Sequence, residues 1–194
     1  MTDHSHEPAH FQKLYEASPD PWHYHDSAYE IAKRDATVAA LGDRRFVAAL
    51  EVGCAIGVLT RQLAAHCDRV LGVDFVPQAL DTARATCAGL PNVSFRAVRV
   101  PAEWPDGAFD LIVLSEVLYF LSDADNAALA ALCHGCLAPG GEILLVNWLE
   151  KSSDDPCSGD DAAKRFIDRA APWSVVSFQR RTDRYRIDRL SPRD

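Results

Sequence analysis

The sequence predicts an α/β protein with a doubly wound, mostly parallel sheet, and three observations support this. Apolar runs of strand length alternate with helix-length segments between about residues 47 and 148. The fourth run, residues 108–114, is apolar almost throughout, as in a strand covered by helices on both faces. Two segments near the C-terminus alternate polar and apolar residues, which predicts a closing antiparallel pair of strands.

The N-terminal part is expected to be helical after a loose start. Residues 1–10 are polar and are predicted to be loose, and a short helix is expected over 11–15. Ser27 followed by Glu30 is typical of a capping box, and Gly42 marks the end of the helix that it begins.

The alternation begins after this helix. No internal repeat or linker interrupts it, so we expect one domain over 1–194. The predicted strands are 47–52, 69–74, 93–98, 108–114, 143–148, 173–178 and 185–190, and the predicted helices are 57–66, 77–88, 124–137 and 160–170.

Composition limits the partners and the compartment. Apolar residues make up 48%, charged residues 25% and the formal net charge is −8, which disfavours nucleic acid and anionic membranes as partners. No apolar stretch approaches the roughly 20 residues of a membrane span, and the N-terminus lacks an apolar signal-peptide core. We therefore expect a cytoplasmic protein whose six cysteines are reduced.

Two local clusters receive ordinary structural interpretations. Cys133 and Cys136 have C-x-x-C spacing but no second ligand pair, so no metal site is expected. Five arginines near the C-terminus are interpreted as the solvated face of the closing strands. They are Arg180, Arg181, Arg184, Arg186 and Arg189.

The turn after the first strand is the most informative feature. Glu51, Gly53 and Gly57 follow an apolar run, and Asp74 ends the next one. Glycines allow a ligand to approach the backbone closely, and an acid at a strand end can accept hydrogen bonds from ribose hydroxyls. The dinucleotide pattern G-x-G-x-x-G is not met, because Ala55 and Val58 occupy its later glycine positions.

This E-x-G-x-x-x-G arrangement resembles the first motif of class I S-adenosylmethionine (SAM) methyltransferases. The segment Phe109–Tyr119 is similar to their fourth-strand motif, and Leu137–Glu142 resembles their L-x-P-G-G turn. The resemblance covers about residues 45–150 and implies a Rossmann-like fold with SAM as cofactor and S-adenosylhomocysteine (SAH) as its product.

The flanking residues are similar to those of the nodulation protein S (NodS) group. Asp20–Tyr24, Ser27–Glu30 and Ser115–Leu121 carry this resemblance. Members of that group N-methylate the deacetylated glucosamine end of a chitooligosaccharide, so the resemblance implies methyl transfer to an amine of a small molecule, such as an amino sugar. The W-G-H and A-G-A elements of the group are absent, and Pro156–Asp161 lies in that region.

The resemblance also divides the chain into functional parts. It implies an N-terminal helical lid over 1–42, a cofactor-binding core over 43–150, and an acceptor-side segment with the closing strands over 151–194. Parallel strands place their carboxyl ends at one edge of a sheet, so the candidate residues are expected to gather there.

For the cofactor, Gly53 and Gly57 are expected to approach the methionine part of SAM, and Asp74 the ribose. Glu51 would orient the turn or the methionine ammonium, and the acid usual after the third strand is replaced by Val98–Ala102. The full expected set is Tyr24, Glu51, Gly53, Cys54, Ala55, Gly57, Asp74, Phe75, Val76, Val100, Pro101, Ala102, Ser115, Glu116 and Val117.

For the reaction, Glu116 is the candidate that orients the acceptor or takes its proton, with Tyr119 beside it. A carboxylate at a helix start and a core tyrosine are the structural alternatives for these two residues. Trp22, Tyr29 and Trp148 are the expected substrate-binding residues, although Trp22 and Tyr24 would equally serve to fasten the N-terminus to the sheet.

Three other functions are weighed against N-methylation. O-methylation of a hydroxyl or carboxylate fits the same residues, and a non-catalytic SAM-binding module is the alternative of another class. An NAD-dependent oxidoreductase is disfavoured by the missing G-x-G-x-x-G. The expected state is a monomer or homodimer that binds a small-molecule acceptor.

Overall fold

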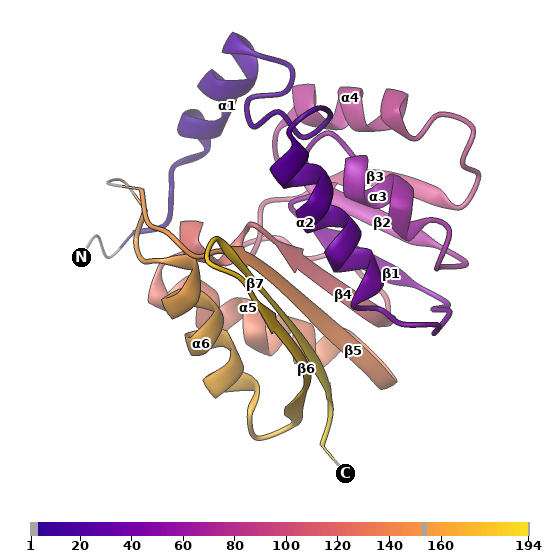
Figure 1. Cartoon of the computed structure of the whole chain (residues 1–194), viewed down its shortest axis with the longest axis vertical. Coiled ribbons are helices and arrows are strands. Elements are labelled where there is room, and N and C mark those ends of the chain that lie inside the picture. The colour runs from indigo at the N-terminus through magenta and orange to yellow at the C-terminus, as the bar shows by residue number, and fades with distance from the viewer. Residues whose placement is uncertain (1–3, 153–154, 194) are drawn as a thin grey trace. The chain divides into compact units, whose positions relative to one another are not determined.

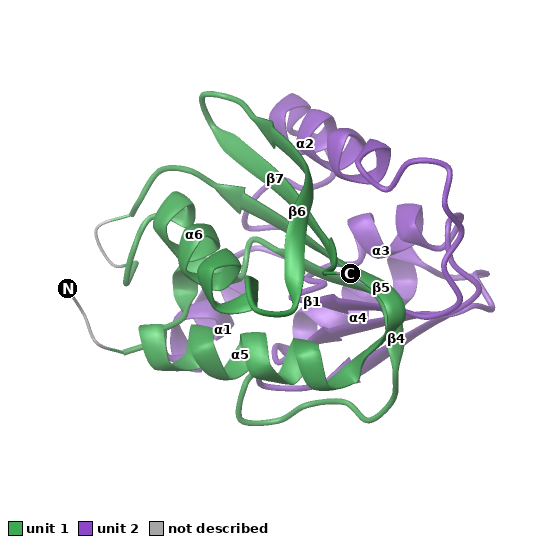
Figure 2. Cartoon of the chain, turned by 90° about the horizontal axis from the view of Figure 1, so that it is seen from below, with its two compact units in different colours: residues 1–6, 100–194 green, residues 7–99 purple. Residues whose placement is uncertain are grey.

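The computed structural model of the protein describes residues 4–152 and 155–193 (Figure 1). The chain divides into two compact units (Figure 2). Unit 2 comprises residues 7–99, and unit 1 comprises residues 1–6 and 100–194.

Unit 2 contains four helices and three parallel strands among its described elements. Strand β2 lies between β1 and β3, pairing Val70 with Ala49 on one side and with Val93 on the other. The elements are α1 (Pro8–Ala17), α2 (Ala28–Ala39), β1 (Ala49–Val52), α3 (Val58–Leu63), β2 (Val70–Asp74), α4 (Pro77–Thr86) and β3 (Val93–Ala97).

Local chemistry explains where these helices begin. The Ser27 hydroxyl accepts a hydrogen bond from the Glu30 backbone N–H at 3.4 Å, so the predicted cap of α2 is confirmed. Both α1 and α4 begin with a proline. Proline is tolerated there because the first backbone N–H groups of a helix have no acceptor within the helix. Helix α1 therefore starts at Pro8, three residues earlier than the predicted helix over 11–15.

Unit 1 contains four strands and its own helices. Strands β4 and β5 pair in parallel, β5 pairs antiparallel with β7, and β7 pairs antiparallel with β6. The predicted closing pair is therefore confirmed. The elements are β4 (Phe109–Ser115), η1 (Leu118–Phe120), α5 (Asp123–Cys136), β5 (Leu137–Trp148), α6 (Gly159–Ala170), β6 (Ser174–Arg181) and β7 (Tyr185–Pro192).

Strand β5 begins earlier than the sequence predicts. It includes Pro139–Gly141, which we expected to form a turn before a strand over 143–148. The pairing explains the difference: Leu137 already pairs with Phe109, and after a register shift Glu142 pairs with Leu111. The turn is thus an irregularity within the strand, with Gly140 at φ 73°.

The expectation of a loose N-terminus through residue 10 is wrong for residues 5 and 6. The Ser5 hydroxyl accepts a hydrogen bond from the Ser122 backbone N–H at 2.8 Å and bonds to the Asp125 carboxylate. His6 donates its backbone N–H to the Phe120 carbonyl at 2.9 Å. These contacts fasten the segment to the start of α5 within unit 1; residues 1–3 lie outside the described residues.

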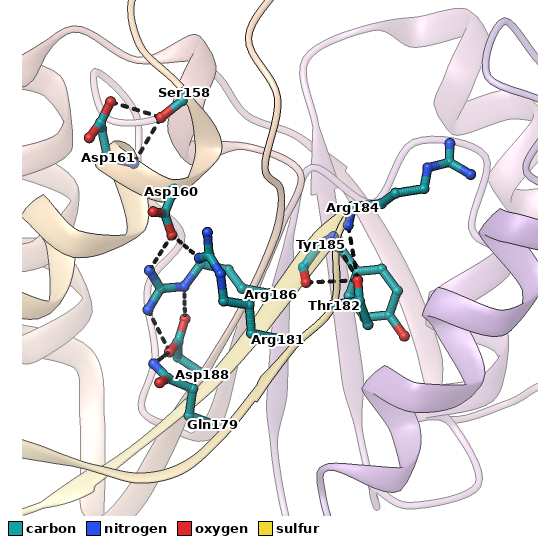
Figure 3. A network of polar contacts seen from close by, with 10 residues as sticks. All are labelled: Ser158, Asp160, Asp161, Gln179, Arg181, Thr182, Arg184, Tyr185, Arg186 and Asp188. Atoms are coloured by element: carbon teal, nitrogen blue, oxygen red, sulfur yellow. Dashed lines mark hydrogen bonds and ion pairs between the residues drawn. The ribbon is translucent and has the colours of Figure 1, made fainter.

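The C-terminal arginines do not form a uniformly solvated face, so that interpretation is wrong for Arg186. Arg186 is 8% exposed, and its guanidinium donates hydrogen bonds to Asp188 at 2.7 Å and to Asp160 at 2.7 Å (Figure 3). Arg181 also pairs with Asp160. The first turn of α6 supplies Asp160, and the sequence pattern of the strands alone gave no sign of this partner.

Among the helices of the described residues, none combines the length and the apolarity needed to cross a membrane.

Gly57 is required by packing within unit 2. It precedes α3 at φ 79°, and a Cβ built on it would lie 3.0 Å from both Cα and Cβ of Ala83 in α4. The Cys87 thiol donates to the Gly57 carbonyl at 3.4 Å. The close approach of α3 and α4 therefore accounts for this glycine apart from any ligand.

We expect Gly57→Ala to destabilise the protein more than Gly89→Ala. Both glycines have positive φ, but nothing lies within 4 Å of a Cβ at Gly89. The control should lose about 1 kcal/mol through backbone strain alone, whereas Gly57→Ala adds a steric clash. Urea denaturation of both variants measures the difference, and equal losses would contradict the packing argument.

Candidate functional site

The Asp74 carboxylate ties the glycine turn to the end of β2. Its Oδ2 accepts from the Ala55 backbone N–H at 3.1 Å, and its Oδ1 accepts from the Val76 N–H at 2.9 Å. Gly53 and Ala55 both have left-handed backbones, with φ of 73° and 48°. A non-glycine residue in this conformation is strained, so the carboxylate supports an unusual turn.

Glu51 lies buried in β1, at the start of the same turn. It is 2% exposed and accepts a hydrogen bond from the Thr60 hydroxyl at 2.5 Å. Burial raises the pKa of Glu51 to about 8; the Thr60 hydrogen bond opposes this shift and the Asp74 charge adds to it. The pKa of Asp74 is also raised by burial, against the effect of its backbone hydrogen bonds.

The two buried carboxyl groups lie in a site without a counter-charge from the described residues. In the part of the chain that the structure describes, neither Glu51 nor Asp74 pairs with a lysine or arginine. Burying carboxylates without a counter-charge is costly, so a positively charged ligand would stabilise their ionised forms. This charge balance suits SAM, which carries a sulfonium and an ammonium group.

Aromatic side chains from the N-terminal segment gather beside this site within unit 2. Phe11 meets Phe75 edge to face at 5.5 Å between ring centroids, and Tyr15 meets Trp22 at 5.6 Å. The cluster brings together four predicted residues: Trp22, Tyr24 and Phe75 pack against a buried group that includes the fourth, Val76. It comprises Tyr15, Ile56, Val76 and Ala79, with Phe11, Trp22, Tyr24, Val58 and Phe75 packed against them.

Tyr15 is a site residue that the sequence analysis missed. Burial raises the pKa of its phenol, and the nearby charge of Asp74 raises it further. The hydroxyl therefore stays protonated, as a neutral hydrogen-bond donor. An aromatic residue in an amphipathic helix gave no signal of this role, because core packing accounts for most such residues.

In unit 1, Glu116 is held by two hydrogen bonds at the end of β4. Its Oε2 accepts from the Tyr119 hydroxyl at 2.6 Å and from the Trp148 backbone N–H at 3.1 Å. Its backbone is left-handed, with φ of 59°, and donates to the Val146 carbonyl at 2.8 Å. The short helix η1 brings Tyr119 back towards Glu116, so these three predicted residues do lie together.

The remaining predicted residues have less distinctive positions. Tyr29 lies in α2 outside the aromatic cluster, with the Lys33 ammonium 4.9 Å from its ring centroid. Ser115 and Val117 flank Glu116 and are half-buried, and Cys54 is buried with its thiol pKa raised by burial. Val100, Pro101 and Ala102 begin the large segment of unit 1, and their expected part in cofactor binding stays a prediction.

The fold defines the class of protein. The chain has the class I methyltransferase fold: it matches the crystal structure of NodS from Bradyrhizobium japonicum in complex with SAH at a TM-score of 0.82 and 21% identity. That match covers 95% of this chain and 98% of that one. A putative methyltransferase from Pseudomonas syringae matches at a TM-score of 0.74 and 32% identity, over 84% and 98% of the two chains.

The family follows from the sequence. The family model described as Nodulation protein S (NodS) matches residues 8–145, and the chain belongs to this family. Nodulation protein S from Rhizobium tropici is 37% identical over 131 residues, and that from Sinorhizobium fredii is 33% identical over 138. These alignments cover 66% and 69% of this chain, but only 55% and 63% of the two relatives.

We expect Glu51→Gln to change the pH dependence of stability. Because the native pKa of Glu51 is raised to about 8 from its ordinary value of 4.5, its contribution to stability is present at low pH. That contribution is lost as the pH rises from about 5 to 8. In the ligand-free protein, the Tm of the variant minus that of the wild type should therefore be larger at pH 8 than at pH 5.

Thermal unfolding of both proteins across this pH range measures the effect. Glu16→Gln is a suitable control, because Glu16 is an exposed glutamate of α1. A difference between Glu51→Gln and wild type that does not vary with pH would contradict the raised pKa.

Proposed function

We propose that the protein is a SAM-dependent methyltransferase that transfers a methyl group to an amine nitrogen of a small molecule, with amino sugars as the leading class. The observation that carries the proposal is the buried carboxylate pair Glu51 and Asp74 on the glycine turn of a NodS-family chain. The pair lacks a cationic partner among the described residues, as a site for a cationic cofactor would.

The residues of unit 2 would hold the cofactor. SAM supplies a methyl group already activated by its positively charged sulfur. Asp74 would accept hydrogen bonds from the ribose, while Glu51 would balance the positive charge of the methionine end. Trp22, Tyr24 and Phe75 provide aromatic faces, which exclude water and attract cations.

The residues of unit 1 would bind the acceptor. A carboxylate attracts a protonated amine and, by accepting a proton, helps to leave the nitrogen lone pair free for attack. The Tyr119 hydroxyl and the Trp148 N–H fix the Glu116 carboxylate through its Oε2. The same charge repels a carboxylate acceptor, so it favours an amine over carboxylate O-methylation.

We also propose a cytoplasmic location, and the cysteines support it. All six are free: Cys54, Cys67, Cys87, Cys133, Cys136 and Cys157. Reducing compartments preserve free thiols in this number, whereas secreted proteins commonly oxidise them.

Asp74→Asn should weaken SAH binding about 10- to 100-fold, because hydrogen bonds to a charged acceptor are replaced by weaker ones. Calorimetric titration with SAH measures this. Asp81→Asn is the control, since Asp81 is an exposed aspartate of α4 that pairs with Arg84. Failure of the wild type to bind either SAH or SAM would overturn the proposed cofactor.

Glu116→Gln should lower kcat/KM about 10- to 100-fold, because an amide neither pairs with an ammonium nor takes its proton. The measurement is SAH release with a panel of amines that includes glucosamine and a deacetylated chitooligosaccharide. NMR of the product identifies the methylated atom.

Glu150→Gln is the matched control for Glu116, since Glu150 is an exposed glutamate just after β5. Equal activities of the two variants would remove Glu116 from the reaction. A methyl group found on oxygen would replace N-methylation by the O-methyl alternative.

A further inference from the structure

Asn147 is a buried amide whose polar atoms lack hydrogen-bond partners. It is the second-last residue of β5 and is 0% exposed. Among the described residues, neither its Oδ1 nor its Nδ2 makes a hydrogen bond. Leaving such groups unpaired is costly, so proteins keep them mainly where they serve another purpose.

A second buried asparagine of unit 1 shows the ordinary arrangement. Asn126 in α5 is 2% exposed, and its Nδ2 donates to the Ala162 carbonyl at 3.2 Å. Its Oδ1 accepts from the Arg169 guanidinium at 2.9 Å. Both amide ends of Asn126 are therefore satisfied by the protein, whereas those of Asn147 are not.

Two neighbours of Asn147 in unit 1, Arg186 and Gly159, leave its amide without a hydrogen bond. Arg186, its partner in the β5–β7 register, directs its three guanidinium nitrogens to Asp160 and Asp188 (Figure 3). Gly159 begins α6 so close to β5 that a Cβ there would lie 3.2 Å from the Asn147 Cβ and 1.7 Å from the Trp148 carbonyl oxygen. Arg186 therefore points its guanidinium at carboxylates and makes no hydrogen bond with the Asn147 amide.

The position of Asn147 connects it to the proposed acceptor site. The next residue, Trp148, donates its backbone N–H to Glu116 Oε2 at 3.1 Å. Asn147 thus sits at the carboxyl end of its strand, one residue from the contact that holds the proposed amine-binding carboxylate. Ligands of open α/β sheets bind at such strand ends.

We propose that Asn147 is a specificity residue that binds a hydroxyl group of the acceptor near the methylated nitrogen. An amide offers both a donor and an acceptor, and a hydroxyl complements both at once. This inference rests on the proposed function and deepens it: the acceptor class becomes an amino alcohol, as in an amino sugar. A resident water could supply the same chemistry, and the two sources are separable by experiment.

The first test compares Asn147→Leu with Asn126→Leu in thermal unfolding of the ligand-free protein. Leucine has the same number of side-chain heavy atoms as asparagine, branched at the same carbon, and removes both polar ends. If the Asn147 amide has no partner until a ligand binds, Asn147→Leu should leave Tm unchanged or raise it. Asn126→Leu should lower Tm by several degrees. A comparable loss in both variants would show that resident water already satisfies Asn147, which overturns the proposal.

The second test uses trans-2-aminocyclohexanol and cyclohexylamine, which differ by one hydroxyl. The wild type should prefer the amino alcohol, and Asn147→Leu should lower its kcat/KM about tenfold, chiefly through KM. The variant should change the value for cyclohexylamine less than twofold. Equal effects on the two compounds would overturn the proposal while leaving amine methylation intact.

Failure of the proposed function gives a different result, namely a wild type that releases no SAH with any amine. Calorimetry of the same two compounds with the SAH-saturated protein then decides the inference. Tighter binding of the amino alcohol that is lost in Asn147→Leu supports a hydroxyl-binding site, and equal or absent binding of both compounds overturns it.

Discussion

The hydrogen bonds from the Ala55 and Val76 backbone to Asp74 are the interaction on which the cofactor half of this protein depends. They join the turn after β1 to the end of β2 and hold Ala55 in a left-handed conformation at φ 48°. Such a conformation persists only where neighbouring groups support it. The same carboxylate is the group proposed to accept the ribose, so it shapes the turn and presents a ligand site at once.

Glu116 in unit 1 follows a comparable principle. Its strained backbone, at φ 59°, turns the chain away from β4, and Tyr119 and Trp148 fix the carboxylate that results. Left-handed non-glycine residues are uncommon in proteins. Of the three in the described part of the chain, two are predicted site residues, Ala55 and Glu116, and the third is His23. Backbone strain therefore coincides with the residues selected independently from sequence motifs.

The sequence predicts the fold well because the alternation of apolar runs reflects burial directly. The order and type of the main elements agree with the structure, while their bounds shift where pairing or capping decides, as at Leu137 and Pro8. Motif spacing likewise led to Asp74 and Glu116. Tyr15 and Asn147 could not be predicted from the sequence, because tertiary structure distinguishes them. Tyr15 is distinguished by burial and the charge of Asp74, which is distant in the chain, and Asn147 by the lack of a partner for its amide. The burial of Arg186 was missed for the same reason.

Some buried polar groups in this chain are fully paired, and others are not. Asp188, fully buried in the middle of β7, is matched by Arg186 and by Gln179, and Asn126 is matched at both ends of its amide. At or near the carboxyl ends of β1, β2 and β5, by contrast, two carboxylates lack a counter-charge and one amide lacks hydrogen-bond partners. A structural role would favour full pairing at every buried position. At these three strand-end positions ligands would complete the pairing, a cation for the carboxylates and a hydroxyl for the amide.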